Sequence, residues 1–285
     1  MFFWRLIQLI KKNRKFQFQF YIKKYVKSSS DRKEKKKKKV QDEYAEADEI
    51  IDLLKNNIVV YGKNLVKDYS IGEFIVRAVD NVTIKIKEGE FVVIKGPSGA
   101  GKTTLLNLIG GLDTPNEGSI YGNGVKISDM NEESLASFRL IYSGFIFQNY
   151  NLISTLTAEE NIIFVLKTAG MDLKESRERA VTLLKKVGLG DRREHLPFQL
   201  SAGEQQRVAI ARSLSTDPPI IIGDEITANL DKKTSEFIRD LFKDLKSEKK
   251  TIILTTHDDK LIDLADRIIT FDDGKIVEEN VISNK

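Results

Sequence analysis

The sequence predicts an α/β fold with a mostly parallel central sheet, an antiparallel β layer on its N-terminal side, and an inserted all-helical subdomain. Short apolar runs rich in β-branched residues alternate with helical stretches from Ile58 onward. Residues 58–86 instead alternate apolar with polar side chains, and residues 157–189 carry a helical pattern without a strand. These three patterns predict strands buried on both faces, a sheet with one exposed face, and a helical insert.

The parallel sheet is predicted from five strands. Phe91–Lys95 is a continuous apolar run, and a helix follows it directly after a glycine-rich turn. The other four expected strands are Gly144–Gln148, Ile220–Asp224, Thr251–Thr256 and Arg267–Phe271. Unbroken apolar runs of this length are typical of strands covered on both faces. The antiparallel layer of residues 58–86 is expected at the edge of this sheet.

The helical insert is predicted from its start and stop signals. Thr157 with Glu160 forms a capping box, and Asp172 with Glu175 is a similar helix start. Gly188 is expected to end the second helix, because glycine readily takes the left-handed conformation there. We expect the helical subdomain to span about residues 149–206, within a domain of residues 58–285.

The composition excludes several classes of protein. The chain has 285 residues, no cysteine and two histidines, so a disulfide-stapled fold and a thiolate metal site are excluded. No run reaches the roughly 18 apolar residues of a membrane-spanning helix. His195 lies in no motif and is interpreted as an ordinary surface residue.

The charge is divided unevenly along the chain. Residues 1–39 carry a net charge of +13, and the remaining residues a net charge of −9. We interpret residues 1–40 as a basic extension that is disordered or lies on a membrane surface. A contact with nucleic acid is the third possibility. The apolar opening does not match a secretory signal, because no positive charge precedes it and no small-residue cleavage site follows it.

Residues 41–57 form an acidic link between this extension and the domain. Their apolar residues recur at helical spacing, which predicts a short amphipathic helix. The residues expected on its apolar face are Tyr44, Ala47, Ile51 and Leu54.

The strongest motif is GPSGAGKTT, which fits the phosphate-binding loop pattern G-x-x-x-x-G-K-[ST] between a strand and a helix. Its backbone N–H groups would surround phosphate oxygens, Lys102 would supply a positive charge, and Thr103 a hydroxyl for Mg²⁺. The expected nucleotide contacts are Gly96, Pro97, Ser98, Gly99, Ala100, Gly101, Lys102, Thr103 and Thr104. The motif predicts a P-loop NTPase.

A second acidic motif, IIIGDE, follows a buried strand. The strand would deliver Asp224 and Glu225 to the carboxyl edge of the sheet, where α/β proteins bind ligands. We expect Asp224 to hold Mg²⁺ through water, and Glu225 to act as general base toward the attacking water.

A third motif, LSAGEQQRVAIARSL, lies between these two. Ser201 with Glu204 forms a capping box, which predicts a second anion site at the start of the helix Gln205–Leu214. Together the three motifs resemble the ATP-binding subunit of ABC transporters, over about residues 58–278. The resemblance implies that Ser201, Ala202, Gly203 and Glu204 contact ATP held by a second subunit.

The same resemblance implies further site residues. Gln148 corresponds to the glutamine that contacts Mg²⁺ and the attacking water, Asp231 to the D-loop aspartate, and His257 to the switch histidine. Tyr69 corresponds to the aromatic side chain that stacks on adenine, with Phe74 as the second candidate. The sequences of the motifs are similar to those of the lipoprotein-releasing, macrolide-export and cell-division group of ATPases.

The resemblance also implies partners. These are a second ATP-binding subunit in a head-to-tail homodimer, a separate membrane permease, and the cofactors ATP and Mg²⁺, at the cytoplasmic face of the membrane. Residues 1–39 would then contact anionic lipid, and a nucleic-acid partner is disfavoured. The alternative is a soluble ABC-type ATPase that acts on ribosomes or nucleic acid. Two departures from the family pattern are Ala202, in place of a glycine, and Ile226, in place of a proline.

Overall fold

A computed structural model describes residues 48–228 and 230–282 of the chain. The basic extension and two predicted helix positions, Tyr44 and Ala47, lie outside the described residues. Within the described residues, no helix combines the length and apolarity that crossing a membrane requires.

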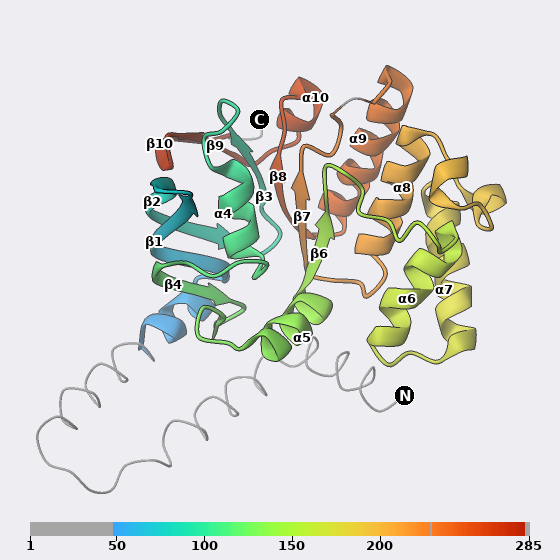
Figure 1. Cartoon of the computed structure of the whole chain (residues 1–285), viewed down its shortest axis with the longest axis horizontal. Coiled ribbons are helices and arrows are strands. Elements are labelled where there is room, and N and C mark those ends of the chain that lie inside the picture. The colour runs from blue at the N-terminus through green and yellow to red at the C-terminus, as the bar shows by residue number, and fades with distance from the viewer. Residues whose placement is uncertain (1–47, 229, 283–285) are drawn as a thin grey trace, which may run out of the picture.

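The centre of the molecule is a six-stranded sheet (Figure 1). In order across the sheet, the strands are β10 (Lys275–Val281), β9 (Arg267–Asp272), β3 (Phe91–Lys95), β8 (Thr251–Thr255), β7 (Ile220–Asp224) and β6 (Ser143–Ile146). All neighbours pair in parallel except β10, which is antiparallel to β9. The prediction of a mostly parallel sheet is confirmed. However, β6 ends at Ile146, so Gln148 lies in the following turn rather than in the strand.

The antiparallel layer is a sheet of its own. Its order is β2 (Phe74–Lys87), β1 (Ile58–Ile71), β4 (Glu117–Gly122) and β5 (Val125–Lys126). The expectation that it lies at the edge of the parallel sheet is wrong, because β1 pairs with β2 on one side and β4 on the other. Helix α4 (Lys102–Ile109) packs between the two sheets, where Leu105 and Leu108 are buried in a shared apolar core.

The chain between β6 and β7 is helical, as predicted. It contains α6 (Ala158–Thr168), α7 (Leu173–Lys186), the short turns η1 (Gly190–Arg192) and η2 (Pro197–Gln199), and α8 (Ala202–Ser213). Thr157 and Glu160 form the predicted capping box of α6, and Asp172 caps α7. Helix α8 begins at Ala202 rather than at Gln205, because Ser201 is itself the capping residue.

The second face of the parallel sheet packs against α8, α9 (Lys232–Ser247) and α10 (Asp259–Ile262), and α6 and α7 pack on α8 beyond the sheet (Figure 1). Phe91 of β3 and Phe242 of α9 are fully buried there, with their ring centroids 6.4 Å apart. Helix α5 (Glu132–Tyr142) precedes β6 and buries Leu135 and Phe138 in the core around α4. The two faces therefore carry separate apolar cores, and the site lies at the carboxyl edge between them.

Residues 48–55 form a helix that packs on the antiparallel sheet. Its buried side chains are Ile50 and Leu53, which lie with Tyr61 and Tyr121 in a small apolar cluster. The predicted positions Ile51 and Leu54 are only half-buried, so the apolar face is turned by about one residue.

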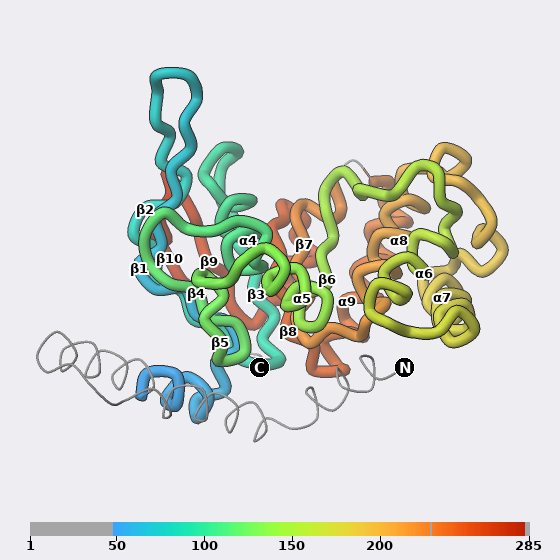
Figure 2. Tube along the Cα trace, turned by 60° about the horizontal axis from the view of Figure 1, so that its bottom comes forward, coloured from blue at the N-terminus to red at the C-terminus, as the bar shows by residue number. Residues whose placement is uncertain are grey.

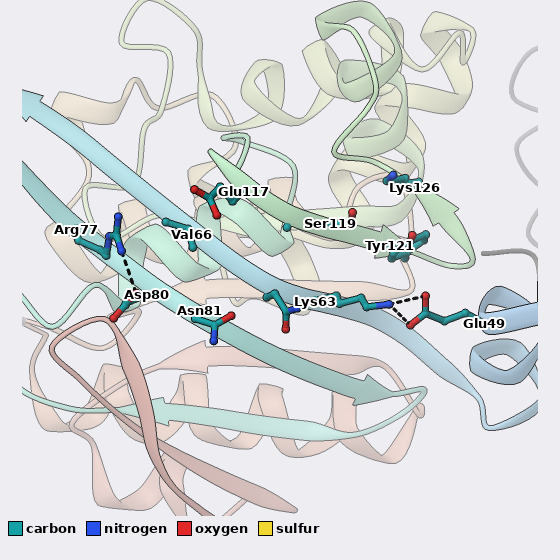
Figure 3. A pocket seen from close by; sticks show the side chains of 12 residues that line it. Glu49, Lys63, Val66, Arg77, Asp80, Asn81, Glu117, Ser119, Tyr121 and Lys126 are labelled. Carbon is teal, nitrogen blue, oxygen red and sulfur yellow. Dashed lines mark hydrogen bonds and ion pairs between the residues drawn. The ribbon is translucent and has the colours of Figure 1, made fainter. Parts of the chain in front are cut away.

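A polar contact completes this docking. Glu49 accepts hydrogen bonds from Tyr61 Oη at 3.0 Å and from Lys63 Nζ at 2.8 Å. Burial and the hydrogen bond to Glu49 raise the pKa of Tyr61 to about 12. Glu49 and Lys63 border an open groove of about 970 Å³ on this sheet (Figure 3). Charged pairs such as Lys63 with Glu49 and Arg77 with Asp80 neutralise one another within the groove.

Candidate functional site

The predicted phosphate-binding loop connects β3 to α4. A Cβ on Gly96 would lie 1.8 Å from the carbonyl oxygen of Phe271, and one on Gly101 would lie 2.0 Å from that of Ala78. Gly101 also has φ of 98°, in the left-handed region. Only glycine therefore allows the loop to lie so close to the β9 and β2 backbones. Along the tip Pro97, Ser98 and Gly99 are exposed, whereas Ala100 is buried.

Lys102 lies at the centre of this loop. Its Nζ donates to the carbonyl oxygens of Gly96 and Pro97, both at 2.8 Å, and only 8% of the residue is exposed. The ammonium group is thus held at the N-terminus of α4, where the helix dipole and the loop N–H groups favour an anion. Phosphate oxygens would offer it charge-assisted hydrogen bonds in place of the neutral carbonyls. The loop fits a nucleotide phosphate.

Asp224 connects the phosphate loop to the central strands. Thr103 Oγ1 donates to one oxygen of its carboxylate at 2.8 Å, and Thr255 Oγ1 donates to the other. Asp224 ends β7, and Thr255 lies opposite it at the end of β8. The Thr103 hydroxyl and the carboxylate together form a pair of hard oxygen donors, which is the ligand chemistry that Mg²⁺ prefers. The residues present therefore fit the metal.

Glu225 and His257 lie in direct contact. The Nε2 of His257 is 3.3 Å from Oε1 of Glu225, although the two residues come from different strand ends. Glu225 has φ of 46°, in the left-handed region, where a side chain costs about 1–3 kcal/mol. Its N–H donates to both the carbonyl oxygen and Oγ1 of Thr255 at 3.0 Å. Two hydrogen bonds from the backbone of Glu225 thus hold a strained residue in place and aim its carboxylate at His257.

Gln148 follows β6, which pairs with the strand that ends at Asp224. It occupies an exposed turn two residues beyond Ile146, which pairs with Gly223 in the neighbouring strand. Within residues 48–228 and 230–282, no hydrogen bond joins Gln148 to another predicted site residue. The turn is anchored instead by Arg212 of α8, which donates to the carbonyl oxygens of Tyr150 and Asn151.

Tyr69 lies on β1 beside the start of α4. Its hydroxyl donates to Asp113 at 2.8 Å and contacts the side chain of Thr104. Lys67 Nζ lies 5.1 Å from the centre of the tyrosine ring and 2.6 Å from Asp113. Burial and the hydrogen bond to Asp113 raise the pKa of Tyr69. The second aromatic candidate, Phe74, is 77% exposed at the end of the hairpin, so Tyr69 has the better position beside the phosphate loop.

The third motif is a helix start that faces solvent. Ser201 Oγ accepts from the N–H of Glu204 at 3.3 Å, and Glu204 Oε2 accepts from the N–H of Ser201 at 2.8 Å. Hydrogen bonds from Ser201 outweigh the opposing effect of burial and lower the pKa of Glu204. Ser201 and Ala202 are exposed. The first-turn N–H groups of α8 therefore point away from the protomer, and the phosphate loop lies elsewhere in the same chain (Figure 1).

Gly203 and Asp231 join this helix to the D-loop. A Cβ on Gly203 would lie 2.8 Å from the side chain of Thr234, so glycine is required here. Thr234 in turn donates through its N–H and Oγ1 to Asp231 at 3.0 and 2.6 Å. The hydrogen bonds from Thr234 lower the pKa of Asp231, which caps α9. The departure from the family pattern is therefore at the exposed position Ala202, whereas the tightly packed position Gly203 keeps its glycine.

The second departure from the family pattern has a packing role. Ile226 is 1% exposed and belongs to the apolar core around α8. Its carbonyl oxygen accepts from Nε2 of the buried Gln206 at 2.9 Å. A branched apolar side chain therefore fills the space beside the end of β7, and α8 supports the segment after Glu225.

Several supporting residues were missed in the sequence. Thr255, Asp113, Lys67 and Arg212 are placed by tertiary contacts 31 to 62 residues away in sequence, and none belongs to a short motif. Thr255 alone had a signal, since it lies two residues before His257 at the end of a predicted strand. His195 is half-buried, and its carbonyl oxygen accepts from the N–H of Ala158 at the start of α6.

A groove of about 730 Å³ lies between α5, β6 and α6. Apolar side chains line much of it, and Phe164 of α6 is 55% exposed there. The floor is fixed by Asn161, which is fully buried and exchanges hydrogen bonds with the backbone of Ile153 at 2.8 and 3.1 Å. The groove is therefore a formed surface whose wall continues into the turn that carries Gln148.

Comparisons with known proteins agree with this geometry. A family model described as ABC transporter matches residues 79–228. An ABC transporter ATP-binding protein of Methanocaldococcus jannaschii is 48% identical over 77% of this chain and 98% of its own length. The macrolide export ATP-binding/permease protein MacB of Hyphomonas neptunium is 44% identical over 76% of this chain, which corresponds to 34% of that protein.

Solved structures show the same similarity. The ATP-binding cassette MJ0796, solved as a dimer in a post-hydrolysis state with ADP and Pi, superposes with a TM-score of 0.76. The match has 44% sequence identity and covers 79% of this chain and 100% of that chain. The phosphate loop, the paired acids and these matches lead to one conclusion: the chain is an ATPase that belongs to the ABC transporter ATP-binding family.

Proposed function

We propose that this ATPase drives a separate integral-membrane permease, through ATP-dependent closure of a head-to-tail homodimer. The observation that carries the proposal is the formed groove between α5 and α6, because its lining includes Phe147 and Asn151, which lie on either side of Gln148, and because β6 pairs with β7. A partner seated in that groove would be coupled mechanically to the hydrolytic site. Export, lipoprotein release and mechanical transmission are the types of work that this arrangement serves.

The residues of one protomer bind and orient the nucleotide. Lys102 and the loop N–H groups hold the phosphates, and Tyr69 provides an aromatic surface for adenine. Thr103, Asp224 (through water) and Gln148 provide oxygen ligands for Mg²⁺, which when bound would neutralise charge on the phosphates. Glu225 accepts a proton from the attacking water, and His257 beside it orients this group.

The second protomer supplies the remaining contact. The N–H groups at the start of α8 form an anion site that faces away from its own chain, so the γ-phosphate of a nucleotide held by a second copy is its natural ligand. Residues Ser201 to Glu204 make this contact, and Asp231 lies next to it through Thr234. ATP thereby joins two protomers, and its hydrolysis separates them. The dimeric form of MJ0796 supports this proposal.

We place the working complex at the cytoplasmic face of the membrane as a peripheral assembly. The net charge of +13 in residues 1–39 is opposite to that of anionic lipid headgroups, so this extension would tether the ATPase there. Vesicles with and without anionic lipid, tested against full-length and 41–285 protein, measure this contact. Equal binding by the two proteins contradicts the tether.

Co-purification tests the permease. A tagged chain co-expressed with the permease gene next to its own is expected to retain that membrane protein. Phe164→Asp places a charge in the groove and is expected to reduce the recovery at least about tenfold. Leu173→Asp is the matched control, because Leu173 is 50% exposed on the neighbouring α7 and lies outside the groove. Recovery of ribosomes or DNA instead would favour a soluble ABC-type ATPase and contradict the proposal.

A further inference from the structure

We propose that an apolar contact between two copies of this chain closes over the adenine end of each nucleotide. The contact joins the end of the β1–β2 hairpin in one protomer to Phe198 in the other. The hairpin end, residues 71–76, is called here the hairpin tip. This inference rests on the head-to-tail dimer proposed above, and it adds an interaction surface to it.

The hairpin tip exposes an unusual amount of apolar surface. Ile71 is 64% exposed, Phe74 77% and Ile75 73%. The two strands remain paired up to Ile71 and Phe74, so these side chains belong to a regular hairpin rather than to a loose loop. Figure 2 shows the hairpin projecting well beyond the rest of the antiparallel sheet. Contiguous exposed apolar groups of this kind mark interaction surfaces.

Phe198 is as exposed as Phe74, at 77%. It lies in η2, three residues before Ser201. The turn is held by hydrogen bonds to Leu196 and Pro197, and Pro197 itself is buried. The phenyl ring is thus presented on a fixed turn next to the start of α8.

The two surfaces cannot meet within one protomer. In Figures 1 and 2 the hairpin lies on one side of the molecule, and the segment before α8 lies on the opposite side. Both nevertheless lie next to a nucleotide-binding element. Ile71, where the hairpin tip begins, follows Tyr69 on β1, and Phe198 precedes Ser201 of the third motif by about 10 Å along the chain.

The head-to-tail arrangement brings these neighbours together. When Ser201 of one protomer faces the phosphates held by the other, the chain just before it extends along the nucleotide toward Tyr69 and the hairpin tip. Phe198 and Phe74 then bury each other, and the contact occurs twice because the dimer has two-fold symmetry. A second copy is therefore the occupant that the position of these side chains favours.

A cross-linking experiment tests the contact directly, because the chain contains no cysteine. Phe74→Cys and Phe198→Cys are combined in the Glu225→Gln background, and a short bifunctional maleimide is added with and without ATP and Mg²⁺. The expected result is a covalent dimer that forms with ATP and only in the double variant. Leu173→Cys replaces Phe198→Cys in the matched control, since Leu173 is also exposed on the helical insert.

Size-exclusion chromatography of the same samples separates the possible failures. If the Glu225→Gln protein dimerises with ATP but no cross-link forms, the contact proposed here is wrong and the dimer stands. If no dimer forms with ATP, the proposed dimer and this contact are both wrong. In addition, Phe198→Ser is expected to raise the dimer dissociation constant at least about tenfold, because two buried rings are lost per dimer. An equal change for Leu173→Ser would overturn the proposal.

Discussion

Two regions of this ATPase are built differently: the phosphate end, around the loop of residues 96–104, and the signature end, around residues 198–204 at the start of α8. At the phosphate end, Lys102 is 8% exposed and Thr255 is fully buried, and hydrogen bonds connect the loop to the ends of β7 and β8. At the signature end, Ser201 and Ala202 are exposed, and Phe198 beside them is 77% exposed. One end is thus complete within a single chain, whereas the other presents a formed surface to a partner.

This difference separates two kinds of function. A nucleotide can be held by the self-contained end before any dimer exists, because the loop and its lysine are already positioned. In the proposed dimer, the exposed end contributes only when a second copy brings its α8 to the phosphates. Substitutions at the phosphate end should therefore change nucleotide affinity or hydrolysis in each protomer. Substitutions at the signature end should change the affinity of one protomer for the other.

The largest expected effects come from the two charged residues of the phosphate end. Lys102→Ala should abolish detectable nucleotide binding, because the loop loses its positive charge.

Glu225→Gln should retain ATP binding but reduce hydrolysis by about 10²–10⁴-fold, and should accumulate an ATP-bound dimer. Isothermal titration calorimetry, phosphate release and size-exclusion chromatography measure the three quantities. Normal hydrolysis by the Glu225→Gln protein would show that another group is the base.

Thr255→Val is expected to have the next largest effect. The hydroxyl of Thr255 donates to Asp224 and accepts from the N–H of Glu225, so its loss frees both acids of the site. We expect turnover to fall about 10–100-fold while ATP affinity changes little. Thr251→Val is the control. Thr251 lies at the opposite end of β8 from Thr255, and its Oγ1 accepts from the N–H of Gly89 rather than from a residue of the site. A comparable loss of turnover in the control would contradict this role.

Asp113→Asn tests the support of Tyr69. The substitution keeps an acceptor for the tyrosine hydroxyl but removes the charge that pairs with Lys67. We expect the KM for ATP to rise about two- to tenfold with kcat unchanged, because the ring is held less firmly. Steady-state kinetics measure this split. A fall in kcat alone would assign Asp113 to the chemical step instead.

The same variant carries a pH dependence. Although burial opposes it, hydrogen bonds from Lys67 and Tyr69 lower the pKa of Asp113 below its usual value. The carboxylate therefore stabilises the fold above the pKa of an unfolded aspartate, and this stabilisation is lost as the pH falls through the lowered value. The urea midpoint of the native chain should exceed that of Asp113→Asn at pH 7, and the difference should shrink toward pH 3. A constant difference would contradict the ion pair.

The sequence predicted the phosphate end better than its supports. Short motifs place Lys102 and Thr103 at the start of α4 and Asp224 and Glu225 at the end of β7, because each motif covers a single junction between a loop and a helix or strand. The supporting side chains of Thr255 and Asp113 come from distant segments, and only the folded chain brings them to the site. Local pattern carries no information about such pairings.

The fold shows the same division. Strand and helix positions followed from apolar periodicity and capping residues, as with Thr157 and Ser201. The antiparallel layer was predicted from its alternating pattern, but its separation from the parallel sheet was not, since β4 joins β1 across more than 40 residues of chain. The docked face of the helix at residues 48–55 was also missed, because neighbouring apolar residues leave two possible faces.

The smallest expected effect concerns Ala202, and it tests the exposed end most directly. Ala202 is the first residue of α8, and its methyl group faces solvent beside Ser201. In a closed dimer this methyl would lie against the phosphates held by the partner, where a glycine allows closer approach of the backbone N–H groups. Ala202→Gly should therefore raise ATPase turnover by about two- to fivefold at saturating ATP.

The dependence on protein concentration identifies where this gain arises. If Ala202 acts only across the dimer, the nucleotide affinity of the monomeric protein stays the same, and the gain appears only at protein concentrations where dimers form. Gly203→Ala is the opposite substitution on the same turn, and it should reduce turnover because its Cβ would press against Thr234. Unchanged or lower turnover in Ala202→Gly would mean that the methyl group does not limit closure, and that the exposed end tolerates more variation than the buried packing of Gly203 does.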